Sequence, residues 1–128
     1  MSDRYIKCVV DAFAQAAERA RRAWFDGVQI LAAHGFLLSQ FLCPRYNPRK
    51  DRYGGAIENR ARILREVLKA VKDTVGPRFP ILVKINASDR VENCMTLHES
   101  TIVASMLQDA GADAIELSGG LLNVANLM

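Results

Sequence analysis

Residues 25–42, with the sequence FDGVQILAAHGFLLSQFL, contain the part of the chain that decides its fold. Within this stretch, residues 27–30 predict a short buried strand, and His34 follows that strand in a loop that contains Gly35. Residues 37–42 predict a compact helical turn that would hold the loop in place. Parallel α/β barrels carry their chemistry in such loops, directly after the carboxyl ends of strands. The stretch therefore indicates a strand that presents a histidine at its end.

Helices and strands are predicted to alternate along the rest of the chain. Apolar residues at steps of three and four predict amphipathic helices over residues 3–24 and 56–75. A capping-box pattern that begins at Thr96 opens a third helix, and mostly apolar strands are predicted over residues 80–86 and 114–118. This alternation builds a parallel sheet through right-handed crossovers. Three strands are too few to close a barrel, which needs eight strands and about 250 residues.

The composition is that of an ordinary globular chain. The sequence has 128 residues, of which 50% are hydrophobic and 24% charged, and its formal net charge is +3. This length suits one domain. Basic residues cluster beside two prolines at Arg45, Arg49, Lys50 and Arg52. We interpret the cluster as a solvated loop and expect no nucleic-acid partner, because interleaved aromatic residues and a wider basic face are missing.

Cysteine usage and hydropathy predict a cytoplasmic protein. Cys8, Cys43 and Cys94 are odd in number and widely spaced, without a CxxC pair. We interpret them as reduced thiols, not as a disulfide framework or a metal cluster, and expect no metal. No apolar run approaches the roughly 20 residues of a membrane span. The amino terminus lacks the charged-then-apolar pattern of a signal peptide, so no membrane association is expected.

Three positions at or near predicted strand ends are candidates for chemistry. His34, Lys84 and Ser118 would emerge at the same rim of a parallel barrel. Each also has a structural interpretation. A lone histidine is more often structural, a lysine on an apolar strand can pair with a neighbouring carboxylate, and a serine followed by two glycines can form a tight turn. His98, near the start of a predicted helix, is expected at the surface.

Residues 44–62, PRYNPRKDRYGGAIENRAR, follow a pattern that is usual in one enzyme family, S-P-x-x-N-x-R-x-D-x-Y-G-G-S-x-E-N-R. Together with residues 25–42, 76–86 and 116–120, they resemble the old yellow enzyme family, the NADH:flavin oxidoreductases and NADH oxidases, over nearly the whole chain. The resemblance implies an α/β fold, a (β/α)8 TIM barrel that binds FMN at its carboxyl rim. The chain would be an incomplete TIM barrel of about three parallel strands, from helix 3 to strand 6. It would form one partial barrel domain over its whole length, residues 1–128.

The resemblance also implies a reaction. Hydride passes from NAD(P)H to FMN and then to an activated alkene, a quinone or oxygen. In the family, two donors usually hold the carbonyl oxygen of the substrate, and a tyrosine commonly supplies a proton. His34 matches the second donor, but Leu31 stands at the first donor position and Phe36 at the tyrosine position. Two of the three expected groups are therefore replaced by apolar side chains.

Cofactor contacts are implied at the two later strands. Lys84 matches a basic residue that faces the N1 and O2 edge of the flavin, where reduced flavin carries negative charge. Ser118 and Gly119, at the end of the last predicted strand, are expected to contact the cofactor as well.

We therefore expect a fragment of an FMN-dependent NAD(P)H oxidoreductase, of the ene-reductase or NADH:flavin oxidoreductase type, with doubtful activity on its own. A small-molecule substrate is expected for the full barrel, with NAD(P)H as co-substrate. The exposed strand edges suggest self-association or a complementing chain. Two alternatives stay open: a non-catalytic piece that assembles with another chain to complete a barrel, and a truncated gene remnant.

Overall fold

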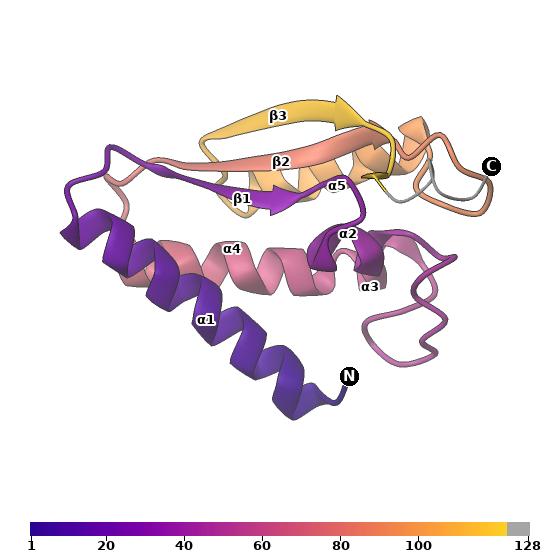
Figure 1. Ribbon diagram of the computed structural model, residues 1–128, viewed down its shortest axis with the longest axis horizontal. Helices are drawn as coiled ribbons and strands as arrows, with labels where there is room; N and C mark the ends of the chain where they lie inside the picture. The colour runs from indigo at the N-terminus through magenta and orange to yellow at the C-terminus, as the bar shows by residue number, and fades with distance from the viewer. Residues whose placement is uncertain (123–128) are drawn as a thin grey trace.

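A three-stranded parallel sheet organises the chain (Figure 1). The computed structural model describes residues 1–122. Its strands are β1 (Val28–Ala32), β2 (Ile81–Ser88) and β3 (Ala114–Gly119), which lie in the order β1-β2-β3. Both neighbouring pairs are parallel. The predicted α/β class and the three predicted strands are confirmed.

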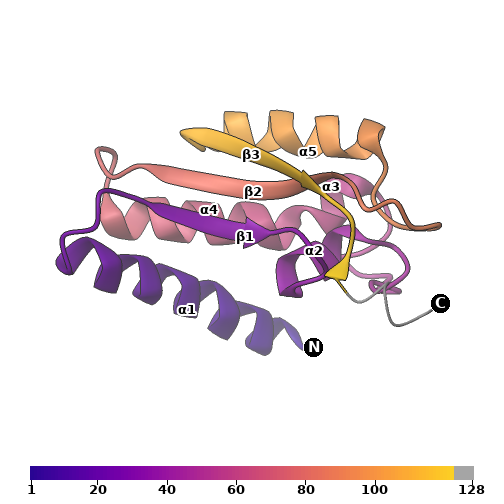
Figure 2. The same ribbon diagram turned by 45° about the horizontal axis from the view of Figure 1, so that its top comes forward.

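Helices connect and cover these strands. They are α1 (Asp3–Arg22), α2 (Leu37–Leu42), α3 (Ile57–Arg60), α4 (Arg62–Val75) and α5 (Leu97–Asp109). In Figure 1, α1 and α4 lie below the strands and α5 behind them, and Figure 2 shows α1 and α4 running along the sheet. No helix in the described part of the chain is both long and apolar enough to cross a membrane.

The helix predicted over residues 56–75 is divided into two. Ala61 separates α3 from α4; its φ of −79° and ψ of −7° stay in the right-handed region, but the ψ lies away from the α-helical value of about −42°. The apolar spacing did not predict this break, because it continues without interruption from Ile57 through Ala61 to Leu64. All three residues are buried and lie on the same side of the two helices. His98 is exposed on α5, as expected.

The two faces of the sheet differ in burial. On β2, Val83 and Ile85 are fully buried and belong to the main core, together with the apolar sides of α1, α4 and α5. Successive side chains of a strand point to opposite faces, so Lys84 lies on the other face. The strand register pairs it there with Leu31 on β1 and Glu116 on β3, both of which are exposed. In a closed (β/α)8 barrel this open face would be the interior.

An ion pair between the buried Arg60 and the partly buried Glu99 joins α3 to the start of α5. The Arg60 guanidinium donates hydrogen bonds to the carbonyls of Leu42 and Gly55 and pairs with the Glu99 carboxylate. Glu99 also accepts from the N–H of Thr96, whose hydroxyl accepts from the N–H of Glu99. The predicted capping box is therefore confirmed. Burial alone would raise the pKa of Glu99, but the bonds from Thr96 and Arg60 outweigh it and hold the pKa below its usual range.

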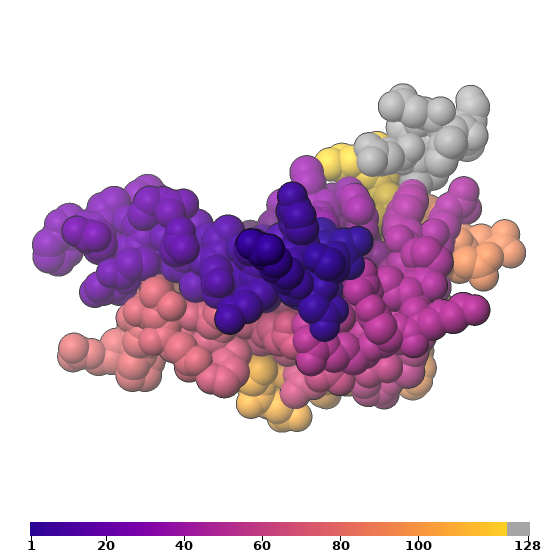
Figure 3. Space-filling model, turned by 90° about the horizontal axis from the view of Figure 1, so that it is seen from below, coloured from indigo at the N-terminus to yellow at the C-terminus, as the bar shows by residue number. Residues whose placement is uncertain are grey.

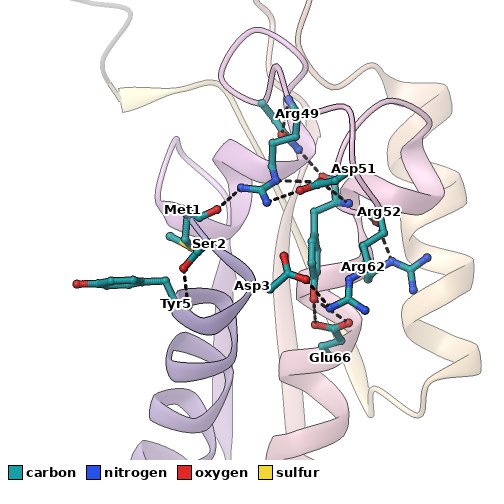
Figure 4. A network of polar contacts seen from close by, with 11 residues as sticks. Met1, Ser2, Asp3, Tyr5, Arg49, Asp51, Arg52, Arg62 and Glu66 are labelled. Atoms are coloured by element: carbon teal, nitrogen blue, oxygen red, sulfur yellow. Dashed lines mark hydrogen bonds and ion pairs between the residues drawn. The ribbon is translucent and has the colours of Figure 1, made fainter.

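The basic loop after α2 is tied to the amino-terminal end of α1. The Arg49 guanidinium donates to the Asp51 carboxylate and to the Met1 carbonyl (Figure 4). Arg52 pairs with Asp3 at 3.0 Å. Figure 3 shows the indigo start of α1 lying directly against the magenta loop. Arg49 and Arg52 therefore have structural partners, which supports the interpretation of the basic cluster as a loop.

Cys43 and Cys94 form a disulfide bond, so the prediction of reduced thiols is wrong for these two residues. They are 51 residues apart in the sequence, and their spacing carries no signal of a pair. The fold brings them together because Cys43 follows α2 and Cys94 follows β2, and both segments lie at the carboxyl end of the sheet. Cys8 is a free, exposed thiol on α1.

We expect the start of α5 to lose protection when Glu99→Gln removes the partly buried negative charge that pairs with Arg60. Since the pKa of Glu99 is lowered, its contribution is present above the pKa of an unfolded glutamate, about 4.3. The contribution disappears as the pH falls through the lower folded value. The variant should lose about 1.5 kcal/mol at neutral pH, the scale of one hydrogen bond to a charged group. Amide hydrogen exchange of α5, followed from neutral to acid pH, measures both effects.

The matched control is Glu58→Gln, at an exposed position of α3. It should leave the exchange of α5 as it is in the wild type. If wild type and Glu99→Gln have the same exchange at every pH, the role assigned to this ion pair is wrong.

Candidate active site

His34 lies just after β1 in a left-handed backbone turn. Its φ is +62°, and the φ of Gly35 is +84°. This conformation costs a non-glycine residue roughly 1–2 kcal/mol, so surrounding contacts must hold the turn. The Leu122 N–H donates to the His34 carbonyl at 3.2 Å, and His34 forms a parallel bridge with Leu121. The segment after β3 therefore fixes the loop after β1.

Helix α2 closes the same loop from its other end. The Ser39 hydroxyl accepts from the Gly35 N–H at 3.2 Å, and the Gln40 side-chain amide donates to the Gly35 carbonyl at 2.7 Å. Residues 37–42 thus hold the loop, as the sequence predicted.

The side chains of His34 and Ser118 meet at the carboxyl rim. His34 Nε2 and Ser118 Oγ are 3.0 Å apart, although 84 positions separate the residues in the sequence. Both side chains are partly buried. Gly119 ends β3 beside Ser88, and Gly120 has a φ of +78° while its N–H donates to the Ser88 carbonyl. The strand end is therefore both a tight turn and the place where two candidate residues come together.

Lys84 is engaged in an ion pair on the open face. Its Nζ lies 2.8 Å from Glu116 Oε1, and the Gln29 amide donates to Glu116 Oε2 at 2.7 Å. The bond from Lys84 holds the pKa of Glu116 below its usual range, and the bond from Gln29 adds to this effect. Lys84 therefore has a neighbouring carboxylate partner, as its structural interpretation from the sequence proposed. No hydrogen bond or ion pair within residues 1–122 joins Lys84 directly to His34 or Ser118.

Glu116 and Gln29 are site residues that the sequence did not predict. Both lie on strands at positions that share a face with a candidate residue, since Glu116 is two residues before Ser118 and Gln29 is two before Leu31. The sequence signal that could have identified them is a charged or amide side chain inside an otherwise apolar strand. Strand register, which no residue pattern specified here, decides that these side chains meet.

Two exposed apolar side chains belong to the same region. Leu31 exposes 37% of its surface on the open face, and Phe36 exposes 49% at the start of α2. Neither side chain can donate a hydrogen bond. The arrangement therefore offers an imidazole that can bind a polar acceptor and an ammonium that can face negative charge, beside apolar surface.

Lys84→Met should raise the pKa of Glu116 toward that of an ordinary glutamate, about 4.3, because the cation that stabilises the carboxylate is removed. The Gln29 bond remains, so part of the lowering should persist. An NMR titration of the Glu116 side-chain carboxyl carbon measures the change. Lys69→Met is the matched control, since it removes a lysine from an exposed pair with Asp73 on α4. A Glu116 titration that is equal in Lys84→Met and wild type would refute the pairing.

Comparison with known proteins identifies the relatives of this chain. Residues 1–126 match the model of a family described as the NADH:flavin oxidoreductase / NADH oxidase family. An NADH oxidase of Thermoanaerobacter brockii is 40% identical over 116 residues, which are 91% of this chain and 18% of the relative. An NADPH dehydrogenase of Bacillus licheniformis is 41% identical over 128 residues, which are 99% of this chain and 37% of the relative.

The fold agrees with these matches. The solved structure of an old yellow enzyme homologue from Zymomonas mobilis superposes with a TM-score of 0.83 and 32% sequence identity. The superposition covers 96% of this chain and 35% of that chain, as expected for an incomplete TIM barrel. The chain thus spans between 18% and 37% of the length of these relatives. By its family match, its sequence identity and its fold, the chain belongs to the NADH:flavin oxidoreductase / NADH oxidase family, which includes the old yellow enzymes.

Proposed function

We propose that this chain forms the part of an FMN-dependent NAD(P)H oxidoreductase barrel that holds the substrate carbonyl and one edge of the flavin. The observation that carries the proposal is the placement of His34 beyond the end of β1 and of Lys84 on the adjoining open face. In (β/α)8 enzymes, catalytic residues come from the carboxyl ends of several strands. The substrate would be an activated alkene or a quinone, with NAD(P)H as the source of hydride.

The open face suits the anionic edge of a reduced flavin. Lys84 has a side chain that is 24% exposed, and it carries a positive charge onto this face. FMN, when bound, supplies a ring that takes up hydride from NAD(P)H and passes it on. Lys84 would stabilise negative charge at the N1 and O2 edge, while Glu116 and Gln29 hold the ammonium in position. Ser118 and Gly119 are proposed to line the same cofactor site.

His34 would bind the carbonyl oxygen of the substrate. That oxygen gains negative charge as hydride reaches the β-carbon, and a fixed donor stabilises the charge. Ser118 Oγ lies within hydrogen-bond distance of Nε2. If the Ser118 hydroxyl donates to Nε2, the ring proton is held at Nδ1, which can then donate to the substrate. Ser118 would thus position the imidazole and select its tautomer.

Leu31 and Phe36 would make this site a poor enone reductase. Leu31 leaves the carbonyl oxygen with one side-chain donor, and Phe36 offers no hydroxyl proton for the α-carbon. Transfer of hydride to the flavin requires neither group. The proposal therefore favours quinones or oxygen over enones as acceptors.

The test is a graft of residues 25–42 into a full-length relative. Loss of one oxyanion donor typically costs about 100- to 1000-fold in rate. Loss of a positioned proton donor costs roughly 100- to 10,000-fold, less if water replaces it. The graft should oxidise NAD(P)H with quinones but reduce cyclohexenone poorly, and Leu31→His with Phe36→Tyr should restore enone reduction.

The rate of flavin reduction by NAD(P)H, measured in the same preparations, controls for damage to the barrel and should stay near that of the parent. A graft that reduces cyclohexenone as fast as the parent would show that Leu31 and Phe36 do not occupy the assigned positions.

We expect the chain by itself to bind FMN weakly and to purify without colour. Lys84 provides one charged contact, worth about 1.5–3 kcal/mol. This energy corresponds to a dissociation constant weaker than about 1 mM. A visible absorption spectrum of the purified chain is the measurement, and a stoichiometric flavin band would contradict the expectation.

A second candidate function is a non-catalytic piece that completes a barrel with another chain. The open sheet face and the outer edges of β1 and β3 favour it, because these edges have no partner strand within residues 1–122 and such edges invite pairing. Self-association would cover the same surfaces. A cytoplasmic location stays a prediction of the sequence.

A further inference from the structure

The disulfide forms a small cluster of its own at the carboxyl rim. Cys43 and Cys94 are buried and pack with Leu121, and the partly buried Val91 lies against them. This group is separate from the main core between the sheet and the helices. None of its members has a part in the function proposed above, so the bond requires its own explanation.

The cluster supports the loop that carries His34. Leu121 bridges to His34, and its side chain comes within 3.8 Å of the place that a Cβ on Gly35 would occupy. Leu121 therefore packs against the two cysteines and also against the His34 loop. A displacement of the cysteines would reach the backbone of the His34 loop through Leu121.

Besides the disulfide, few contacts join the loop before Cys94 to the segment after α2. Two hydrogen bonds of 3.0 Å close the base of this loop. The Asp89 N–H donates to the Met95 carbonyl, and the Met95 N–H donates to the Asp89 carboxylate. Near its tip, the Arg45 N–H donates to the Asn93 carbonyl at 2.9 Å. Asn93 has a φ of +57°, in the left-handed region that asparagine adopts more readily than most other residues. The disulfide is the covalent tie among these contacts.

A metal site is the competing interpretation of the same residues. One ligand atom from each of Cys43, Asp89 and Cys94 lies within 4.8 Å of the others. However, both carboxylate oxygens of Asp89 already accept hydrogen bonds, from the Asn86 amide at 2.7 Å and from the Met95 N–H at 3.0 Å. The two sulfurs are bonded to each other. The geometry therefore favours thiol–disulfide chemistry over metal binding.

We propose that Cys43 and Cys94 form a reversible thiol–disulfide site whose oxidised form positions His34 through Leu121. The reductant is a small dithiol. Because both cysteines are buried, the loop before Cys94 opens before the thiolate of the reductant attacks one cysteine sulfur, and the other sulfur leaves as a thiolate and takes up a proton. The second thiol of the reductant then resolves the mixed disulfide, so two electrons and two protons reach the chain and the reductant leaves as a disulfide. A disulfide oxidant such as oxidised glutathione reverses the reaction. The consequence for substrate binding rests on the proposed function of His34, but the redox chemistry does not.

Thiol counting tests the chemistry on the full chain. Alkylation in denaturant without reductant should modify one thiol, Cys8. When the folded chain is first treated with dithiothreitol and only then denatured, alkylation should modify three, the number of cysteines in the sequence. Cys8→Ser is the matched control: alkylation should modify no thiol before reduction and two thiols after it. Three modified thiols in the untreated wild type, or failure of oxidised glutathione to restore the original count, would overturn the proposal. So would stoichiometric zinc binding by the reduced chain that prevents its reoxidation.

NMR of the chain labelled at histidine Cε1 tests the link to His34. The sequence has two histidines, and His98 on α5 provides an internal reference. Reduction should shift the His34 signal and leave the His98 signal in place. Cys43→Ser and Cys94→Ser should each show the shifted signal and no response to reductant. A His34 signal that reduction does not move would overturn the positioning role. Because this readout needs no flavin or enone, it can fail while the proposed function stands, and the reverse also holds.

Discussion

The parallel register that places Leu31, Lys84 and Glu116 in one row across the sheet is the constraint on which the rest of the structure depends. Because side chains alternate along a strand, this register sends Val83 and Ile85 into the core against the helices. The same register brings a lysine and a glutamate together on the opposite face at 2.8 Å. A shift of β2 by one residue would turn Lys84 toward the apolar core and separate it from Glu116.

The candidate site depends on contacts between distant parts of the chain. His34 follows β1, yet its backbone is held by Leu121 and Leu122, and its ring by Ser118, all at or after the end of β3. The crossovers through α4 and α5 bring these segments to one rim. The position of the His34 loop therefore depends on the position of β3, and a change at the end of β3 would move the imidazole. The site forms only when the sheet brings these segments together.

Features with a local physical cause could be predicted from the sequence. Apolar periodicity located the helices and strands, and the residue pattern at Thr96 predicted the capping box that the structure contains. The resemblance to the old yellow enzyme family was confirmed by the family match and by the fold. The roles of His34 and Lys84 stay proposals, because comparison establishes the family but not what each side chain does.

Features set by tertiary geometry could not be predicted. The Cys43–Cys94 bond joins two loops far apart in the sequence, and nothing in their spacing distinguished these cysteines from Cys8. Sequence reasoning left Lys84 with two interpretations, since only the strand register reveals that Glu116 is its partner. The break at Ala61 changes one backbone angle without disturbing the apolar pattern.

The chain is part of a barrel, and its open sheet face and outer strand edges require a further surface to cover them. Sedimentation velocity of the purified chain measures whether they find one. We expect species heavier than a single chain, because exposed edges and an uncovered sheet face favour association. A single sharp monomer peak, together with a cooperative thermal transition, would contradict it.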